Sequence, residues 1–253
     1  MVERLASKVV VVVGGSSGIG EAVARRVASE GAAVVVGARR TDIGEALAAG
    51  IREAGDRAIF IPTDATVEAD VARLTRMAVE EFGRLDGAFN NAGGVSAAGP
   101  IEAIGDAAWR AELDLNLTSV FYGLAHQVPA MLASGGGSIV NNASLAGVGG
   151  IGGLAAYSAA KHGVVGLTRA TALECAGRGV RVNALVTGNV DTPLYRRLLG
   201  APLTGEVDLA APNPTGRVAR AAEIAAFVAF LLSDESKFIT GAALAIDGGA
   251  SAQ

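Results

Sequence analysis

Residues 8–20 read K-V-V-V-V-V-G-G-S-S-G-I-G and lead directly into a helix-like segment at residues 21–29. The valine run does not alternate between apolar and polar residues, which is typical of a parallel strand buried on both faces. Gly14, Gly18 and Gly20 permit a tight turn, and a helix that begins there offers free N–H groups and a positive dipole end. Strand, glycine-rich turn and helix in this order favour dinucleotide binding over a purely structural turn.

Apolar runs of the same kind recur along the chain at residues 33–37, 58–62, 85–90, 138–143, 180–186 and 242–246. Helix-like segments lie between most of them, so the sequence predicts seven strands alternating with helices. Such alternation implies right-handed crossovers and a mainly parallel sheet with helices on both faces. We therefore expect an α/β doubly wound Rossmann fold in a single domain spanning residues 1–253.

Composition limits the kind of partner. Of the 253 residues, 51% are hydrophobic and 18% charged, which argues against disorder, and the net charge of −4 disfavours non-specific binding to nucleic acid. No long apolar run and no basic N-terminus with a hydrophobic core is present, so we expect a cytoplasmic protein without a membrane segment. The single cysteine, Cys175, permits no internal disulfide and is expected to pack on a helix.

Ligands of such sheets bind at the carboxyl ends of the strands. After the second strand, Ala38 stands where a ribose-binding carboxylate is usual, and Arg39 and Arg40 follow it. Two cations there favour the 2′-phosphate of NADP, whereas Asp42 keeps NAD as the alternative. Asp64, followed by Ala65, is expected either to accept from the adenine amino group or to cap the next helix.

Further along, Asn91, Ala92 and Gly93 suit backbone that passes close to a ligand, although an Asx turn would explain them as well. Residues 106–127 predict one long helix with an apolar stripe formed by Trp109, Leu113, Leu117, Val120, Phe121 and Leu124. Asn116 falls among these residues. It is expected either to kink the helix and hold a water molecule behind Lys161, or to satisfy a neighbouring backbone group.

Tyr157 and Lys161 stand four residues apart in an Ala-rich helical segment and share one face. An ammonium beside a phenol favours the phenolate and lowers the tyrosine pKa from about 10 toward a value useful for proton transfer. Ser144, thirteen residues earlier at the end of an apolar run, is placed to face the same reacting oxygen. His126 and His162 are interpreted as structural.

These motifs in order, G-G-S-S-G-I-G, N-N-A-G, Asn116, Ser144 and Y-x-x-x-K, resemble those of the short-chain dehydrogenase/reductase family, and the resemblance extends to Asp247-Gly248-Gly249. It implies that Tyr157 exchanges a proton with a carbonyl or alcohol oxygen, that Ser144 polarises that oxygen, and that Lys161 binds the nicotinamide ribose. Asn116 would support a water chain. The family's cofactor-binding positions are matched by Gly14, Ile19, Asp64, Asn91, Gly93, Val190 and Thr192. The other residues expected to bind the cofactor are Ser16, Ser17, Gly18, Gly20, Arg39, Arg40, Ala65, Ala92, Tyr157, Lys161 and Gly188.

Three positions depart from the family pattern. Val13 replaces a threonine that precedes the first glycine, Thr187 replaces a proline after the sixth strand, and Ala38 replaces the acidic residue. We expect modestly lower rigidity of the turn from the first and a different loop path from the second. The third supports NADP.

The leading hypothesis is an NADP-preferring oxidoreductase that interconverts a ketone and a secondary alcohol, with Asn116, Ser144, Tyr157 and Lys161 as the catalytic group. An NAD-dependent alcohol or polyol dehydrogenase, a non-catalytic nucleotide-binding protein and dehalogenase-like chemistry are the alternatives. The expected substrate is small and apolar, in a pocket formed by Val95, Leu145, Ile151, Leu154, Leu194 and Tyr195. Residues 194–213, with Leu198, Leu199, Leu203 and Leu209, are expected to form a mobile lid or a packed insertion. The resemblance also implies a homotetramer.

Overall fold

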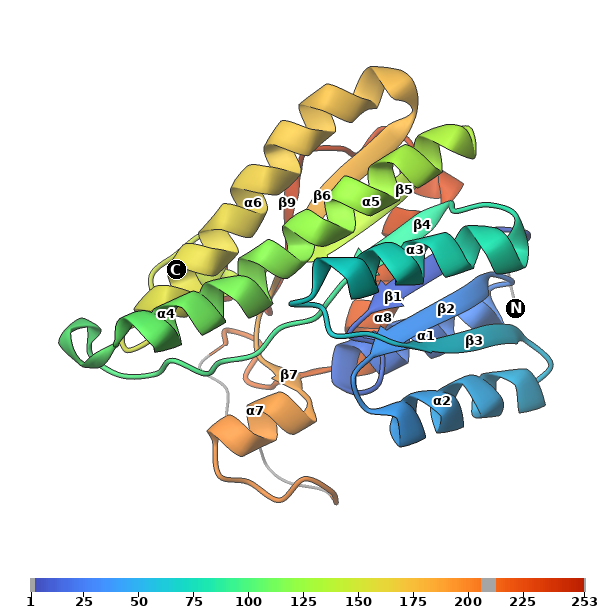
Figure 1. Cartoon of the computed structure of the whole chain (residues 1–253). Helices are drawn as coiled ribbons and strands as arrows, with labels where there is room; N and C mark the ends of the chain where they lie inside the picture. Colours follow the sequence, from blue (N-terminus) through green and yellow to red (C-terminus); the bar gives the residue numbers. More distant parts are fainter. Residues whose placement is uncertain (1–2, 206–212, 253) are drawn as a thin grey trace.

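The computed structural model describes residues 3–205 and 213–252. Seven strands form one sheet in the order β3-β2-β1-β4-β5-β6-β9 (Figure 1), and every pairing in it is parallel. The predicted doubly wound fold and its seven strands are confirmed. The strands are β1 (Val9–Val13), β2 (Ala33–Ala38), β3 (Arg57–Pro62), β4 (Gly87–Asn90), β5 (Gly137–Asn142), β6 (Val180–Thr187) and β9 (Ala243–Ile246).

Helices cover both faces of the sheet (Figure 1). One face carries α1 (Gly18–Ser29), α2 (Thr41–Glu53) and α8 (Ala221–Leu232), and the other carries α3 (Glu68–Phe82), α5 (Ser119–Ala133) and α6 (Ala155–Cys175). Val10 and Val12 of β1 pack in the first core, whereas Val9, Val11 and Val13 pack in the second. All five are at most 2% exposed, which explains why the run shows no alternation.

The expected long helix is interrupted. The chain forms α4 (Asp106–Leu113), a π-helical turn at Asp114–Thr118 and then α5, which ends at Ala133 rather than at residue 127. Val120 and Leu124 are buried after this turn, but Phe121, expected in the same apolar stripe, is 49% exposed.

The segment after β6 holds a small structure that the sequence analysis did not anticipate. β7 (Val190–Asp191) pairs in parallel with β8 (Ala219–Arg220), and α7 (Pro193–Leu198) follows β7 directly. Short 3₁₀ turns complete the described elements, at Ile101–Ala103, Leu145–Gly147, Ala176–Arg178, Asp234–Ser236 and Ala250–Ala252. None of the described helices combines the length and apolar character needed to cross a membrane.

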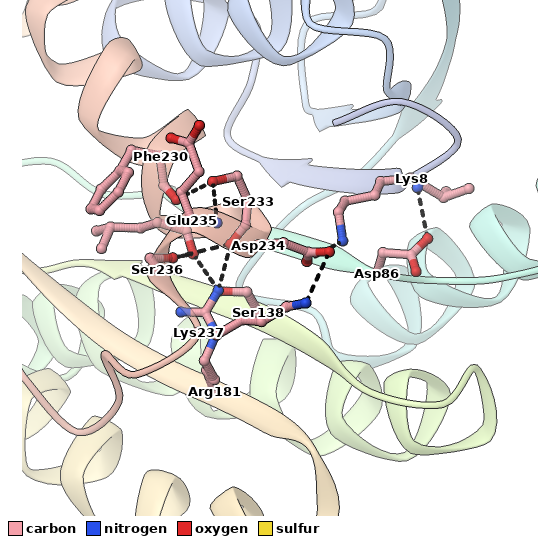
Figure 2. A network of polar contacts seen from close by, with 12 residues as sticks. Lys8, Asp86, Ser138, Arg181, Phe230, Ser233, Asp234, Glu235, Ser236 and Lys237 are labelled. Carbon is pink, nitrogen blue, oxygen red and sulfur yellow. Dashed lines mark hydrogen bonds and ion pairs between the residues drawn. The ribbon is translucent and has the colours of Figure 1, made fainter. Parts of the chain in front are cut away.

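A buried polar network ties the amino ends of the strands to the end of α8 (Figure 2). Arg181 of β6 donates to the carbonyl oxygens of Leu231 at 2.8 Å and Ser233 at 3.1 Å, where the helix ends. Ser138 of β5 donates to the Leu231 carbonyl as well, at 2.7 Å. A guanidinium at a helix C-terminus satisfies carbonyl groups that have no partner within the helix. The contacts at the amino ends of the strands therefore stabilise the fold, while the carboxyl ends of the strands carry the site described next.

Candidate active site

A cavity of about 640 Å³ lies where the strands reach their carboxyl ends. The glycine-rich turn after β1 lines one part of it and Tyr157 with Lys161 another, so residues far apart in the chain share one space. Its volume lies within the range of ligand pockets. Of the predicted site residues, those that line the cavity are Gly14, Ser16, Ser17, Gly18, Ile19, Arg39, Arg40, Asp64, Ala65, Asn91, Ala92, Gly93, Ser144, Tyr157, Lys161, Gly188, Val190 and Thr192. Gly20 and Asn116 lie behind the lining.

The glycines of the turn are required by close backbone packing. Gly14 adopts a φ of +79°, and a Cβ atom built on it would lie 2.7 Å from the backbone nitrogen of Ala92. A Cβ atom on Gly20 would lie 2.2 Å from the carbonyl oxygen of Gly14. The Asn91 side chain donates to that same oxygen at 3.0 Å and so ties the turn to β4. This contact fastens the turn although Val13 offers no hydroxyl there.

The first turn of α1 is open to an anion. Its N-cap residue, Ser17, makes no side-chain hydrogen bond to the helix N–H groups. Ser17 instead accepts from the Arg40 guanidinium at 2.8 Å, and Ser16 accepts from the same nitrogen at 3.2 Å. Arg40 thus joins the end of β2 to the glycine-rich turn beside a helix N-terminus, an arrangement suited to a phosphate.

The other candidates for the ribose and adenine differ in position. Ala38 and Arg39 line the cavity, whereas Asp42 lies exposed in the first turn of α2 and is not among the lining residues. Asp64 accepts from the backbone N–H and the hydroxyl of Thr66, at 2.9 Å and 2.7 Å. These hydrogen bonds lower the pKa of Asp64. It therefore forms an Asx turn rather than the N-cap of α3, which is Val67.

Tyr157, Lys161 and Ser144 meet where β5 ends and α6 begins. The Lys161 ammonium lies 5.5 Å from the centre of the Tyr157 ring and donates to the carbonyl oxygen of Asn142 at 2.8 Å. Its side chain is almost fully buried. Ser144 starts the 3₁₀ turn after β5, and its hydroxyl accepts from the Ala146 N–H at 3.2 Å.

Burial dominates the electrostatics of this pair. It lowers the pKa of Lys161 to about 8, an effect that the Glu112 carboxylate opposes. It raises the pKa of Tyr157, while the Ser144 hydroxyl acts in the lowering direction and Glu112 in the raising direction. The direction of the Tyr157 pKa is thus opposite to the one expected from a neighbouring ammonium, because desolvation of the phenolate outweighs the hydrogen bond with Ser144.

Asn116 lies in the π turn and is fully buried. Its side-chain amide donates to the carbonyl oxygens of Gly94 at 2.9 Å and Glu112 at 3.1 Å, and its oxygen accepts from the Gly94 N–H at 3.1 Å. The side chain thus satisfies backbone groups, as the second alternative expected, and the helix is interrupted at Asn116; a water molecule held behind Lys161 stays a prediction. A Cβ atom on Gly93 would lie 2.9 Å from the Asn116 oxygen and 3.4 Å from the Lys161 nitrogen, so only a glycine separates them.

Asn142 is a site residue that the sequence analysis missed. Besides accepting from Lys161, it donates from its side chain to the Asn91 oxygen at 2.9 Å. Asn91 in turn holds the glycine-rich turn. An amide at the carboxyl end of a central strand was the signal available in the sequence.

The substrate end of the cavity is mainly apolar. Of the six residues expected there, five line it and Leu145 does not. The lining also includes Leu115 and Leu198 and one charged side chain of α7, Arg197. The apolar character that the sequence predicted is thus joined by a cation. His126 and His162 are not among the lining residues; they contact Glu68 and the Ser158 carbonyl.

The described part of the segment expected to form a lid is held by one arginine. Arg196 makes a bidentate ion pair with Asp191 of β7 and donates to the carbonyl oxygens of Pro202 at 3.2 Å and Gly205 at 2.9 Å. Residues 201–205 are therefore fastened beside β7 through one side chain. Leu209 and the other residues at 206–212 lie outside the described part of the chain.

Comparison with known proteins places this site in context. A family model described as "Enoyl-(Acyl carrier protein) reductase" matches residues 13–251. The chain is 44% identical to cis-4-hydroxycyclohexanecarboxylate dehydrogenase of Sinomonas cyclohexanicum, with 98% of each chain covered. It is 38% identical to cyclohexanol dehydrogenase of an Acinetobacter species, with 98% of this chain and 96% of the relative covered. The crystal structure of levodione reductase superposes with a TM-score of 0.92 at 38% identity, over 98% of this chain and 99% of that one.

Proposed function

The chain belongs to the short-chain dehydrogenase/reductase family, and we propose that it interconverts a cyclic secondary alcohol and its ketone with NADP(H) as the preferred cofactor. As a member of this family it is an oxidoreductase of CH–OH groups that uses a nicotinamide cofactor. The observation that carries the finer proposal is a cavity that joins an anion-binding turn, the Tyr157–Lys161 pair and an apolar end.

The residues present fit a nicotinamide dinucleotide. The glycine-rich turn and the open first turn of α1 would hold its pyrophosphate, and Lys161 would contact the nicotinamide ribose. When bound, the cofactor accepts a hydride from the alcohol or supplies one to the ketone.

The protein's own residues handle the proton. In alcohol oxidation, Tyr157 as the phenolate takes the hydroxyl proton of the substrate, and in ketone reduction the neutral phenol returns a proton to the carbonyl oxygen. Ser144 donates a hydrogen bond to that oxygen while charge develops on it. Lys161 opposes the cost of the buried phenolate with its positive charge. The apolar lining excludes water from the reacting centre.

Preference for NADP is supported by the two arginines after β2. Arg40 already contacts both serines of the glycine-rich turn, and Arg39 lines the same part of the cavity. Both donate to anions and would pair with a 2′-phosphate. NAD stays the alternative through Asp42, which lies exposed at the start of α2.

A cyclic substrate is supported by the apolar end of the cavity and by the names of the relatives. Two of these are dehydrogenases of cyclohexane alcohols, and one of those substrates carries a carboxylate. Arg197 at the edge of the apolar lining would pair with such a group. We therefore place cyclohexanols, with and without a carboxylate across the ring, among the first substrates to test.

The decisive experiment is turnover of cyclohexanol and cis-4-hydroxycyclohexanecarboxylate with NADP and with NAD, followed at the absorption of the reduced nicotinamide. Tyr157→Phe should lose at least about 100-fold in kcat, because the proton acceptor is gone. It should keep its cofactor affinity, measured by calorimetry. A Tyr122→Phe variant, which changes a tyrosine of α5 that does not line the cavity, is the matched control. Full activity of the Tyr157→Phe variant would contradict the mechanism.

Assembly and location stay proposals. The homotetramer implied by the family is supported by large apolar side chains on the surface of the isolated chain, such as Leu173 of α6, 86% exposed, and Phe238, fully exposed. The cytoplasmic location is supported by the composition alone.

A further inference from the structure

Glu112, which the mechanism above does not use, is a charged side chain in the interior. It lies in the last turn of α4, and its relative exposure is 0%. A buried carboxylate is costly unless it is fully hydrogen-bonded or paired with a charge. Its position in the sequence, one residue before the apolar Leu113, gives no sign of this role.

The hydrogen bonds of Glu112 reach the two segments that flank Lys161. One carboxylate oxygen accepts from the backbone N–H groups of Ser96 at 2.8 Å and Ala97 at 2.9 Å, and also from the Ser96 hydroxyl. The other oxygen accepts from the Asn116 amide at 3.1 Å. Three of these four donors are N–H groups, which could not accept a hydrogen bond from a protonated carboxyl group. The contacts therefore suit an ionised carboxylate.

No cation among the described residues forms an ion pair with Glu112, so its charge acts at longer range. Asn116, which it holds, lies against Gly94 and is separated from the Lys161 ammonium by Gly93. The Glu112 carboxylate acts in the raising direction on the pKa of both Tyr157 and Lys161; at Tyr157 it adds to the effect of burial, and at Lys161 it opposes the larger lowering effect of burial. It thus favours the state in which the lysine is charged and the tyrosine keeps its proton.

Other charged groups on the elements around Glu112 do not reach this pair. α4 packs against the π turn and α6. Apart from Tyr157 and Lys161, the charged side chains there are exposed, namely Asp106, Arg110, Asp114, His162, Arg169 and Glu174, and the buried thiol of Cys175 lies at the far end of α6, fourteen residues from Lys161. Residues 91–100, on which Glu112 is anchored, contain no charged residue.

We propose that Glu112 is a positioning residue of the active site: it fixes Asn116 and residues 94–97 and supplies the buried negative charge that balances Lys161. The catalytic role of Glu112 rests on the proposed function, whereas its electrostatic effect on Lys161 does not depend on any substrate. Removing the charge should let the Tyr157–Lys161 pair lose its first proton at lower pH, whichever member gives it up.

The test is the pH dependence of kcat/KM for cyclohexanol oxidation with NADP in Glu112→Gln. We expect its midpoint to move down by about 1 pH unit, since one nearby buried charge has this effect. Asp114→Asn is the matched control. Asp114 stands two residues after Glu112 but is exposed to solvent, so the loss of its charge should leave the midpoint unchanged. An unchanged midpoint in folded Glu112→Gln would overturn the proposal even if kcat fell, because a merely structural role predicts that result.

A second readout separates this inference from the proposed function. Tyrosinate absorption, titrated in the wild type and in Glu112→Gln with Tyr157→Phe subtracted from each, reports Tyr157 among the three tyrosines without any substrate. A lower midpoint in Glu112→Gln together with no turnover of any cyclic alcohol would support the charge balance and refute the substrate class. Turnover of a cyclic alcohol together with an unchanged Tyr157 midpoint would support the substrate class and refute the charge balance.

If Glu112→Gln does not fold, the wild type decides the question. Carboxyl ¹³C NMR of glutamate-labelled protein, with the Glu112 signal identified by its loss in Glu112→Asp, reports ionisation directly. An ionised Glu112 at neutral pH is the expected result. A protonated carboxyl there would contradict the proposal.

Discussion

The Lys161 ammonium donates a 2.8 Å hydrogen bond to the carbonyl oxygen of Asn142, which joins α6 to the last residue of β5 inside the site. This contact replaces only part of the hydration that the ammonium loses on burial. The pKa of Lys161 is about 8 instead of the ordinary 10.5, so the folded protein bears the cost of a charged lysine at neutral pH. The site is therefore built at the expense of stability.

Lys161→Met should stabilise the fold and remove activity. The lowered pKa of Lys161 corresponds to a cost of about 3 kcal/mol in the free energy of unfolding, which the substitution removes. Loss of the hydrogen bond to Asn142 costs about 1 kcal/mol, so we expect the free energy of unfolding to rise by about 2 kcal/mol at pH 7. Between pH 8 and 10.5 the unfolded chain binds more protons than the folded one, so wild-type stability rises with pH and the gain shrinks. Urea unfolding at several pH values measures both. Lys237→Met, at an exposed lysine, should show neither effect.

Arg40→Gln should weaken NADP binding by at least about 10-fold and leave NAD binding unchanged, because a charge-assisted contact to the 2′-phosphate is lost. Arg25→Gln, on the exposed surface of α1, is the control. Thermal unfolding with each cofactor gives the ranking without any substrate, since a ligand that binds only the native state raises its stability. A larger shift with NAD than with NADP in the wild type would contradict the NADP preference and favour NAD binding through Asp42.

Arg197→Gln should raise KM for cis-4-hydroxycyclohexanecarboxylate by about 10-fold, the effect of losing one ion-paired contact at a partly wet site. KM for cyclohexanol, which has no carboxylate, should stay the same and serves as the internal control. Equal effects on both substrates would show that Arg197 supports α7 rather than the substrate.

Arg181→Met should destabilise the protein without changing catalysis. The guanidinium donates to carbonyl oxygens at the end of α8 (Figure 2) and to that of Ile239, all near the amino ends of the strands, and its loss should cost about 3 kcal/mol. For a chain of this size that lowers Tm by about 6–12 °C. Arg76→Met, at an exposed ion pair of α3, should change Tm little. A changed KM in Arg181→Met would contradict this expectation, because it would show that contacts at the amino ends of the strands affect the site at their carboxyl ends.

Leu173→Glu should reduce the size of the assembly, because a charge placed in an apolar contact between subunits opposes association. Light scattering measures this, with Val67→Glu, at another exposed apolar side chain, as the control. A wild-type monomer would refute the tetramer outright.

The fold was predictable because its signals are local. Each central strand is buried on both faces, so its β-branched run is recognisable without knowing its neighbours, and the glycine-rich turn needs only its own residues to adopt positive φ at Gly14 and Gly18. The shared face of Tyr157 and Lys161 follows from helical spacing alone.

What only the tertiary structure decided depends on partners distant in the chain. The helix breaks at residues 114–118, where Asn116 hydrogen-bonds Gly94, and Phe121 in the helix that follows is exposed. The direction of the Tyr157 pKa reverses because the assembled core removes water from the phenol, an effect that no sequence spacing encodes. Glu112 is a surface-type residue by its sequence context, and it becomes part of the site only because residues 94–97 fold over it and supply its hydrogen bonds. Desolvation and long-range hydrogen bonding are properties of the packed chain, whereas strand, turn and helix patterns are properties of short segments.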